Sequence, residues 1–543
     1  MARIFTMKNH RLLLTIFTFV CSFCVYADQS QYTLYDEETQ AYQPHRIAII
    51  GAGAAGSSAA YYLQRHAAAQ HLSTPLNVTV FDLNPRVGGR TTTVNAFDDP
   101  AYPVELGASI FVRINHILYN ASREFNLQTS LYDEGETGSD YDLGVWNGET
   151  FVFKTSIGSG RWQGYWDIAK LLWKYGMAPI KTQKLMKSTV GKFLKFYEEP
   201  VFPFSSLDYA VMQTELLDFT AANGVQTLKE GGIGEAFGRD VIQASTRVNY
   251  GQNLGVIHGL ESMVCMATDG AMAIEGGNWQ IFDEAIKRSK AGIQLDTTVT
   301  DVEKDDKGLY HIHTNTTANS QPFDTVILAA PYQYADITFS PPLAVTPKKI
   351  PYVSLHVTLL TTPHLASPSF FNLDPSLQTS IPDTILTTLP ADLDMGTTQG
   401  PSSVGPANFW SINVLRTISP STHSNTTQYL YKIFSPSPMT GTFLSSLFAI
   451  PYSNTSAADP ISDLSKNDIT WYHEKVWNSY PYETPRSSFE EIKLDSTTAS
   501  GTGVWYTSGM ESFISTMETS ALMGMNVARL IVDEIAASEP LAV

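Results

Sequence analysis

A glycine-rich turn near the N-terminus constrains the fold of this chain more than any other stretch. Residues 47–63 read as a short apolar strand, Ile47–Ile50, followed by a turn with three glycines and a helix of small residues. In such a turn Gly51 permits the tight bend, Gly53 leaves room for a diphosphate against the backbone, and Gly56 lets the helix pack close to the strand. The pattern therefore predicts a dinucleotide-binding βαβ unit.

The residues around this turn support the same prediction. The helix would begin at Ala54 and Ala55, where free backbone N–H groups and the positive end of the helix dipole favour an anion. A second apolar strand, Val78–Phe81, ends in Asp82, which is placed to accept hydrogen bonds from a ribose hydroxyl. The alternative is an ordinary packing turn, because glycine-rich turns between a strand and a helix also occur without a nucleotide.

A glycine pair with two arginines follows the second strand. Arg86 and Arg90 flank Gly88 and Gly89, so two cations lie where the charge of a diphosphate must be neutralised. The glycines allow the loop to pass close to a ligand. We therefore expect this loop to belong to the same site, with a basic surface loop as the alternative.

Length and charge limit the classes of function. The chain has 543 residues, more than one hydrophobic core usually organises, so two or more domains are expected. Its composition, with 43% hydrophobic residues, is typical of a globular protein. The formal net charge of −18 at pH 7 argues against a nucleic acid as its main partner.

Residues 1–27 are expected to form a signal peptide. Arg3, Lys8 and Arg11 precede an apolar run, Leu12–Val25, and small residues stand at a plausible cleavage point. The run is short for a membrane span. A retained signal anchor is the alternative, and after removal of the signal no stable membrane span is expected.

Cysteines and glycosylation sequons agree with a secretory route. Beyond the signal segment the chain keeps only Cys265, which stands in an apolar run and is expected to be a buried structural thiol. Asn-X-Ser/Thr sequons begin at Asn77, Asn120, Asn315, Asn425 and Asn454. These features predict a glycoprotein of the secretory pathway, with lysosome, vacuole and extracellular space all open as its destination.

The middle of the chain changes character twice. From 116 to 266 the pattern is mainly helical and rich in aromatic residues. Trp166, Leu171, Trp173 and Met177 form an apolar stripe there, for which we expect packing in the core, with a membrane-facing or ligand-facing stripe as the alternative. Alternating segments between 340 and 490 predict a β-sheet with long loops.

Patterns typical of a nucleotide-binding domain appear again after each of these regions. A helix from Ile281 is followed by a strand with Val299 and Val302, a hairpin, and a buried parallel-type strand in Phe323–Pro331. At the end of the chain, a strand and a glycine turn lead to a helix that Thr516 or Ser515 would cap. The chain therefore leaves the nucleotide domain and comes back to it.

These patterns together predict an α/β fold (α+β overall). It consists of a discontinuous Rossmann-like cofactor domain with an inserted substrate domain of mixed helices and β-sheet. The predicted segments are a signal peptide at 1–27, a flexible lead-in at 28–44, the cofactor domain at 45–115, 267–335 and 491–543, and the substrate domain at 116–266 and 336–490.

Several further segments complete a recognisable set. They are Arg247–Gln252, Ala273–Asn278, Tyr429–Ser435 and Gly509–Ala521. With the Gly51–Gly56 turn, Asp82 and the Arg86–Arg90 loop, they resemble the flavin amine-oxidase-like superfamily and, within it, the prenylcysteine oxidase family. The similarity runs from about residue 45 to 535.

This resemblance implies an FAD-dependent oxidase in the degradation of prenylated proteins. The substrate would be a prenylcysteine, a thioether with a farnesyl or geranylgeranyl group, and molecular oxygen would be the acceptor. Cysteine, a prenyl aldehyde and hydrogen peroxide would be the products, and peripheral contact with a membrane or lipid would suit such a substrate. The alternatives are another flavin oxidase that acts on an amine or a lipid, and a secreted lipid-binding glycoprotein without turnover.

The resemblance also implies roles for individual residues. Asp82 would hold the adenosine ribose, and the Val299 backbone would meet the adenine edge. Arg86 and Arg90 would serve the phosphates and the flavin side. Met517 and Glu518 would lie by the flavin, where helix N–H groups stabilise negative charge that develops on reduction. The predicted cofactor-binding residues are Gly51, Gly53, Ala54, Ala55, Gly56, Asp82, Arg86, Gly89, Arg90, Val299, Gly509, Met517 and Glu518.

No catalytic side chain and no metal site are predicted. A flavin carries the difficult step of such a reaction, so the protein mainly positions the reacting carbon and buries the prenyl tail. Tyr250 and Trp505 are aromatic candidates for the pocket, with a place in the core as the alternative for each.

Overall fold

The computed structural model describes residues 43–131, 137–156, 170–316, 321–420, 427–454, 456–497, 499 and 501–539. In this part of the chain a six-stranded sheet has the order β19-β20-β12-β1-β2-β9. All neighbouring strands are parallel except β19 and β20. The strands are β1 (His45–Ile50), β2 (Leu76–Phe81), β9 (Gly292–Gln294), β12 (Thr325–Leu328), β19 (Lys493–Asp495) and β20 (Gly503–Tyr506).

Strand β1 is the point where the strand order of this sheet reverses. It pairs with β2 on one side and with β12, which follows far later in the sequence, on the other. Parallel strands end at the same edge of a sheet, and ligands of doubly wound folds bind outside the carboxyl ends at such a reversal. The turn after Ile50, the turn after Leu328 and the turn after Tyr506 therefore all lie at the edge where a dinucleotide is expected.

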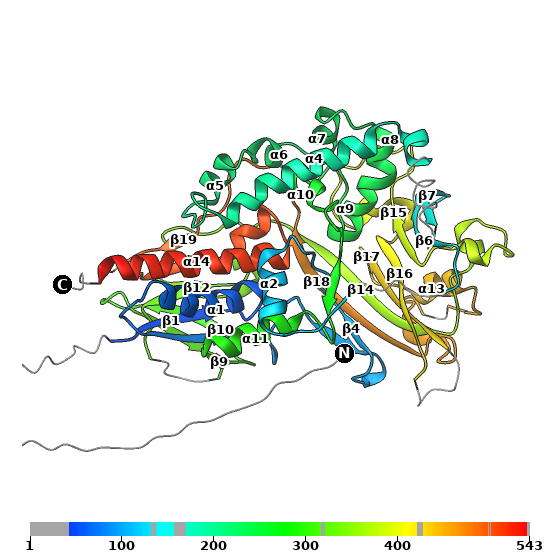
Figure 1. Cartoon of the computed structure of the whole chain (residues 1–543). Coiled ribbons are helices and arrows are strands. Elements are labelled where there is room, and N and C mark those ends of the chain that lie inside the picture. Colours follow the sequence, from blue (N-terminus) through cyan, green and yellow to red (C-terminus); the bar gives the residue numbers. More distant parts are fainter. Residues whose placement is uncertain are drawn as a thin grey trace, which may run out of the picture. The chain divides into compact units, whose positions relative to one another are not determined.

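Two helices with small residues pack against each other on this sheet. They are α1 (Ala54–Ala69) and α14 (Met517–Ser538), which lie side by side in Figure 1. The Ser58 hydroxyl donates to the Ala521 carbonyl, and Gln70 contacts Asp533; both pairs are 463 residues apart, so the helices run parallel. Their N-terminal ends consequently lie at the same edge of the domain.

Gly524 of α14 sets the close approach of these helices. A Cβ atom at this position would lie 2.1 Å from the Ala55 carbonyl oxygen and 2.9 Å from the Ala59 nitrogen. Gly524→Val should therefore destabilise the protein by about 3 kcal/mol through overpacking, measured by urea unfolding. Gly191→Val is the matched control, because a Cβ there meets no atom within 4 Å and Gly191 lies inside a helix. An equal loss of stability in both variants would contradict this account.

A second large sheet is mostly antiparallel. Among the described residues it has seven strands in the order β18-β14-β17-β16-β15-β6-β7, with β15 and β6 as the parallel pair. They are β6 (Tyr141–Trp146), β7 (Phe151–Ser156), β14 (Tyr352–Thr362), β15 (Thr384–Thr387), β16 (Ser411–Ile418), β17 (Gln428–Ser435) and β18 (Trp471–Pro481). The sheet predicted for residues 340–490 is thus present, and two strands from the region expected to be mainly helical extend it.

Eleven further α-helices lie in the described part of the chain. They are α2 (His116–Glu124), α4 (Ala178–Phe193), α5 (Leu207–Gln213), α6 (Leu217–Ala221), α7 (Gly224–Glu230), α8 (Glu235–Phe237), α9 (Gln243–Tyr250), α10 (Gly259–Val264), α11 (Trp279–Ser289), α12 (Tyr332–Ala335) and α13 (Gly441–Phe448).

Three small sheets complete the described structure. The paired strands are β3 (Thr93–Asn95) with β4 (Pro103–Glu105), β5 (Thr129–Leu131) with β8 (Met272–Ile274), and β10 (Val299–Lys304) with β11 (Tyr310–Thr314) and β13 (Thr338–Ser340). The α/β class with a Rossmann-like sheet and a second sheet-and-helix region, predicted from the sequence, is confirmed.

The apolar stripe at residues 166–177 is not core. Trp173 is 88% exposed and Met177 is 57% exposed, so the expectation that they pack in the core is wrong. Leu171 is partly buried against neighbouring apolar residues, and Trp166 lies outside the described residues. Cys265, by contrast, is a buried free thiol as expected. Among the described helices, none is both long and apolar enough to pass through a membrane.

Candidate functional site

The first turn has the geometry of a phosphate cradle. Gly51 has φ +111°, and a Cβ there would lie 2.6 Å from the Ala329 carbonyl oxygen. A Cβ on Gly56 would lie 1.9 Å from the Gly51 carbonyl oxygen. Both glycines are therefore required by the fold itself, since one adopts a left-handed conformation and the other lets α1 approach β1.

Gly53 is different, because nothing in the protein requires a glycine there. Its φ is −78°, and a Cβ would lie 3.8 Å from the Gly89 Cα, an ordinary contact. It stands at the start of α1, which has no side-chain cap and no acidic residue in its first turn. The first N–H groups of the helix, around Ala54 and Ala55, are thus available to an anion.

The second glycine loop packs on the first one. The Gly88 N–H donates to the Ala52 carbonyl at 2.9 Å, and the Cα atoms of Gly53 and Gly89 face each other. A side chain at Gly89 would come within 3.1 Å of Gly53. The structure therefore brings together the two loops that were placed in one site from the sequence.

Donors of the protein occupy most acceptor positions of the Asp82 carboxylate. Its Oδ2 accepts from the Ala52 N–H at 2.7 Å, and its Oδ1 accepts from the backbone and side-chain nitrogens of Asn84 at 2.8 and 2.9 Å. A carboxylate has about four acceptor positions. One position on Oδ2 is left for a ribose hydroxyl, so the predicted role is compatible with this geometry.

Arg86 retains an unneutralised charge. The guanidinium donates to the Gly89 carbonyl at 3.0 Å, and no carboxylate of the described residues lies within ion-pair distance. Burial lowers the pKa of Arg86, and the charge of Asp82 opposes this effect. A half-buried cation without an ion-pair partner beside a helix N-terminus is suited to a diphosphate.

Arg90 forms an ion pair with a residue of the C-terminal part of the chain. Its Nη2 lies 2.7 Å from Oε1 of Glu511, and its Nη1 donates to the Ser479 carbonyl. Glu511 also accepts from the Tyr352 hydroxyl at 3.2 Å. This ion pair connects the glycine loop with the returning C-terminal segment, so Arg90 has a structural role. Its contact with the flavin side stays a prediction.

Arg90→Ala is expected to lower flavin occupancy of the purified protein and to reduce its stability by about 1–2 kcal/mol, since Glu511 loses its ion pair. Absorbance at the flavin band and thermal unfolding measure the two effects. Glu511→Gln is the control that breaks the same pair but keeps the arginine. Unchanged flavin occupancy in Arg90→Ala would show that this loop is assigned wrongly.

The other predicted cofactor residues lie in two places. Val299 is buried in β10, and the Thr297 N–H before it donates to the Asp82 carbonyl at 2.9 Å. Gly509 is buried in the segment that connects β20 with α14, and Met517 is buried as the first residue of α14. The Glu518 carboxylate accepts from the Ile117 and Leu118 N–H groups at 2.8 and 3.0 Å, so the side chain caps α2.

Tyr250 and Trp505, the two aromatic candidates, are both buried. The Tyr250 hydroxyl donates to the Ser515 carbonyl at 3.3 Å, just before α14. Trp505 packs in the core on β20, and Lys493 lies over its ring at 4.5 Å. Tyr250 is therefore next to the returning segment, whereas Trp505 is a core residue.

A buried lysine was not assigned a role from the sequence. Lys432 of β17 donates from Nζ to the Ser109 hydroxyl at 2.7 Å. Burial lowers the pKa of Lys432, and the charge of Glu105 opposes this effect. Burial also raises the pKa of Glu105. The segment that holds Glu105 and Ser109 packs on the Arg90 loop, since the Leu106 N–H donates to the Thr92 carbonyl. The only sequence signal for Lys432 is its place in the 429–435 segment.

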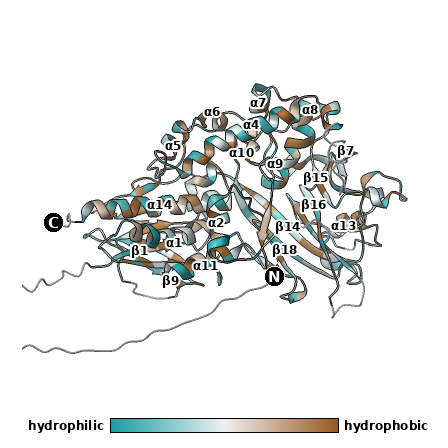
Figure 2. Cartoon of the chain, in the orientation of Figure 1, coloured by the Kyte–Doolittle hydropathy of each residue, from teal (hydrophilic) through white to brown (hydrophobic). Residues whose placement is uncertain are grey.

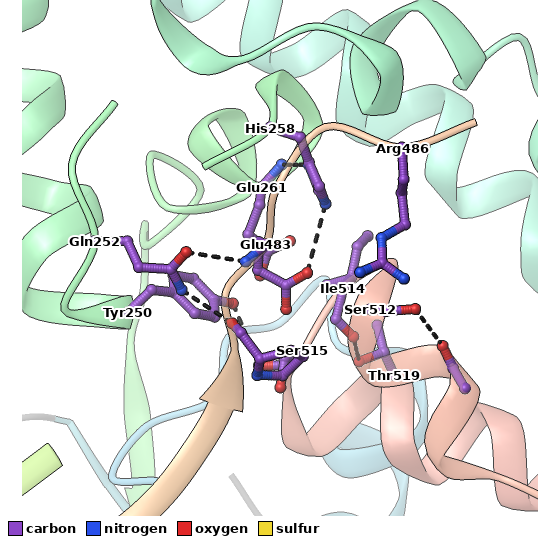
Figure 3. A network of polar contacts seen from close by, with 12 residues as sticks. Tyr250, Gln252, His258, Glu261, Glu483, Arg486, Ser512, Ile514, Ser515 and Thr519 are labelled. Atoms are coloured by element: carbon purple, nitrogen blue, oxygen red, sulfur yellow. Dashed lines mark hydrogen bonds and ion pairs between the residues drawn. The ribbon is translucent and has the colours of Figure 1, made fainter. Parts of the chain in front are cut away.

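Two carboxyl groups lie without hydrogen-bond donors beside Tyr250. The oxygens of Glu261 and Glu483 are buried and have no hydrogen-bond partner among the described residues. Figure 3 shows His258 pointing toward Glu483, with 3.6 Å between Nε2 and Oε2. Burial raises the pKa of both carboxyls and lowers the pKa of His258 to about 3. Burial therefore favours the neutral form of all three groups.

The site fits a dinucleotide cofactor better than a metal. The cradle at Gly53 and Gly89, the uncapped start of α1 and the unpaired Arg86 all suit a diphosphate. Within the part of the chain that the structure describes, no group of His, Cys, Asp and Glu side chains could hold a metal ion.

Comparisons with known proteins give two family matches. The model described as prenylcysteine lyase matches residues 160–541, and a model of the NAD(P)-binding Rossmann-like domain matches residues 49–125. Farnesylcysteine lyase of Arabidopsis thaliana is 27% identical over 515 residues, with 92% of this chain and 90% of that protein covered. Prenylcysteine oxidase 1 of Homo sapiens is 27% identical over 511 residues, with 90% and 88% covered.

Solved structures share the fold at low identity. Cyclohexylamine oxidase from Brevibacterium oxydans IH-35A has a TM-score of 0.53 at 15% identity and covers 90% of this chain and 99% of its own. A triple mutant of putrescine oxidase has a TM-score of 0.51 at 14% identity and covers 92% and 100%. These likenesses confirm the architecture predicted for the chain.

Proposed function

Because the chain belongs to the prenylcysteine lyase family, we propose that it is an FAD-dependent oxidase of S-prenyl-L-cysteine. The reaction converts prenylcysteine, water and oxygen into cysteine, a prenyl aldehyde and hydrogen peroxide. The family match over residues 160–541 carries this proposal, and it confirms the resemblance seen in the sequence. The cradle formed by the two glycine loops supports it, because it accounts for the cofactor that such chemistry needs.

The residues of the cofactor site have separable tasks. Bound FAD would supply the acceptor for a hydride from the carbon next to sulfur. Gly53 and Gly89 would let the diphosphate reach the backbone, and Arg86 would neutralise its charge. Asp82 would use its remaining acceptor position on the adenosine ribose. The adenine edge would meet the backbone of Val299.

The returning C-terminal segment would form the flavin end of the site. Thr516 caps α14, with its hydroxyl accepting from the Thr519 N–H at 3.1 Å, so the first turn of the helix is firmly held. The backbone N–H groups that begin at Met517 carry the positive end of the helix dipole. They would stabilise negative charge at the ring when it is reduced. Gly509 belongs to the same segment.

We also propose an acidic, secretory-pathway location of the lysosomal or vacuolar type, with the extracellular space as the alternative. Support comes from the signal peptide predicted for residues 1–27 and from the sequons. The asparagines of four sequons are described and exposed, which is what glycosylation requires: Asn77, Asn120, Asn315 and Asn454.

The function is tested with purified protein and S-farnesyl-L-cysteine. We expect farnesal, cysteine and hydrogen peroxide in equal amounts, and a similar reaction with the geranylgeranyl analogue. Putrescine and cyclohexylamine, the substrates in the names of the structural neighbours, are the comparison. Turnover of either amine without turnover of a prenylcysteine would replace the proposal with an amine oxidase. Absence of bound flavin together with absence of turnover would favour a lipid-binding protein.

A further inference from the structure

Three exposed apolar side chains lie at the start of helix α4 and just before it. Trp173 is 88% exposed, Met177 57% and Ile180 48%. The opposite side of α4 is buried, with Ala178, Thr182 and Val190 facing the interior. Exposed large apolar residues in such close spacing mark a surface that contacts something other than water.

The segment that carries these apolar residues is rich in lysine. Residues 170–195 contain seven lysines and no Asp, Glu or Arg, in a chain with a formal net charge of −18. The rest of the chain therefore carries −25 (−18 minus 7). Figure 2 shows hydrophilic and hydrophobic residues next to one another along α4. The lysines are Lys170, Lys174, Lys181, Lys184, Lys187, Lys192 and Lys195.

Part of this charge is not neutralised by carboxylates of the described residues. Lys174 pairs with Asp240 at 3.0 Å, and Lys192 pairs with Glu215 at 3.2 Å. Lys181 donates to the Gly232 carbonyl at 2.8 Å but meets no carboxylate. Lys184, Lys187 and Lys195 are exposed and have no ion-pair partner among the described residues. Their positive charges are therefore open to an external anion.

We propose that this lysine-rich face, made of Trp173, Met177, Ile180 and the exposed lysines of residues 170–195, docks on an anionic phospholipid membrane. Tryptophan at the level of the headgroups, apolar side chains below it and lysines toward anionic lipids are the elements of peripheral membrane binding. The strong local excess of positive charge on an acidic protein favours a membrane over a protein partner, because an extended anionic surface matches a whole row of lysines.

Docking explains how a water-soluble enzyme could reach a substrate with a long prenyl chain. Such a substrate partitions into lipid, so an enzyme held at the surface would meet it there. This link rests on the proposed function. The docking itself does not, since it follows from exposure and charge.

The test is co-sedimentation of the glycosylated full-length protein with vesicles in the absence of substrate. We expect binding to vesicles of phosphatidylserine and phosphatidylcholine, little binding to phosphatidylcholine alone, and release in 1 M salt, where the screening length falls to about 3 Å. Because no substrate is present, the result does not depend on turnover.

Two variants assign the binding to this face. Lys181→Gln/Lys184→Gln/Lys187→Gln should weaken binding about a hundredfold, as each lysine near an anionic surface contributes about fivefold. Lys348→Gln/Lys349→Gln/Lys466→Gln removes the same charge from exposed sites elsewhere and should leave binding unchanged. Trp173→Ala should weaken binding about tenfold, whereas Leu377→Ala, at another exposed apolar residue, should not.

Absence of binding to the anionic vesicles would overturn the proposal and favour a protein partner for this face. Equal binding of the two triple variants would also overturn it, because the attraction would then come from the protein as a whole. Circular dichroism of each variant separates a binding defect from a folding defect.

Discussion

Gly53→Ala is expected to leave the fold intact and to remove the bound dinucleotide. The Gly53 backbone has an ordinary negative φ, and a methyl group there would make only a 3.8 Å contact with Gly89. A change of stability within about 0.5 kcal/mol is therefore expected. The methyl group would stand where a diphosphate approaches the backbone, so we expect FAD affinity to fall at least tenfold, about 1.4 kcal/mol or more.

The neighbouring glycine provides the contrast. Gly56→Ala would place a Cβ 1.9 Å from the Gly51 carbonyl oxygen, so it should disturb the packing of α1 on β1 and lower stability as well as flavin content. Flavin absorbance per protein and the unfolding temperature, measured for both variants, distinguish the two cases. If Gly53→Ala retained FAD with wild-type affinity, the turn would not be the diphosphate site.

The protein is also expected to be more stable at pH 5 than at pH 8. Burial raises the pKa of Glu261 and of Glu483, and it outweighs the opposing effects of Tyr250 and the Ser515 backbone on Glu261 and of Arg486 on Glu483. Groups of this kind favour the folded state fully below their unfolded pKa, near 4.3. This contribution is lost as the pH rises toward the folded pKa. The lowered pKa of His258 acts in the opposite direction, because this imidazole is protonated at pH 5 only in the unfolded state. Two carboxyls outweigh one imidazole, so we expect an unfolding temperature about 3 °C higher at pH 5.

Single substitutions assign this pH dependence to the cluster. Glu261→Gln should flatten the profile between pH 5 and pH 8, since the amide does not ionise. Glu230→Gln, at an exposed glutamate, should reproduce the wild-type profile. Unfolding measured by circular dichroism with excess FAD gives the curves. A wild-type profile that is flat, or that falls toward pH 5, would contradict the assignment. Highest stability in mild acid would suit the lysosomal or vacuolar location that we propose.

The parts of the fold that depend on local sequence were predictable. The strand, turn and helix around Gly51–Gly56 follow from glycine spacing, and the buried parallel strand β12 follows from its unbroken apolar run. The cap of α14 at Thr516 was one of two positions expected from residue type alone. In each case the physical cause lies within a few residues of the feature.

The parts that depend on distant partners were not predictable. Arg90 and Glu511, or Lys432 and Ser109, meet only after folding, and the second pair is 323 residues apart. The exposure of Trp173 was missed because an apolar stripe predicts burial, and the sequence does not tell whether another element covers it. Strand β7 was missed because its aromatic residues lie in a region dominated by helical patterns.

The site shows the same division. The sequence places Asp82 at the end of β2, but the bonds from Ala52 and Asn84 that occupy most of its carboxylate appear only in the structure. The glycines of the two loops could be assigned to one site, whereas the carboxyl cluster of Glu261 and Glu483 carries no motif. Buried polar groups of this kind are found by burial and by their lack of partners, which a sequence does not show.

The account is tested most directly by the flavin absorbance of the purified protein under anaerobic conditions. Addition of S-farnesyl-L-cysteine is expected to bleach the absorbance at the flavin band. Admission of air should restore it, with one equivalent each of farnesal and hydrogen peroxide released. Persistence of the absorbance with farnesyl and geranylgeranyl cysteine, in protein that carries flavin, would contradict the central claim that this chain is a prenylcysteine oxidase.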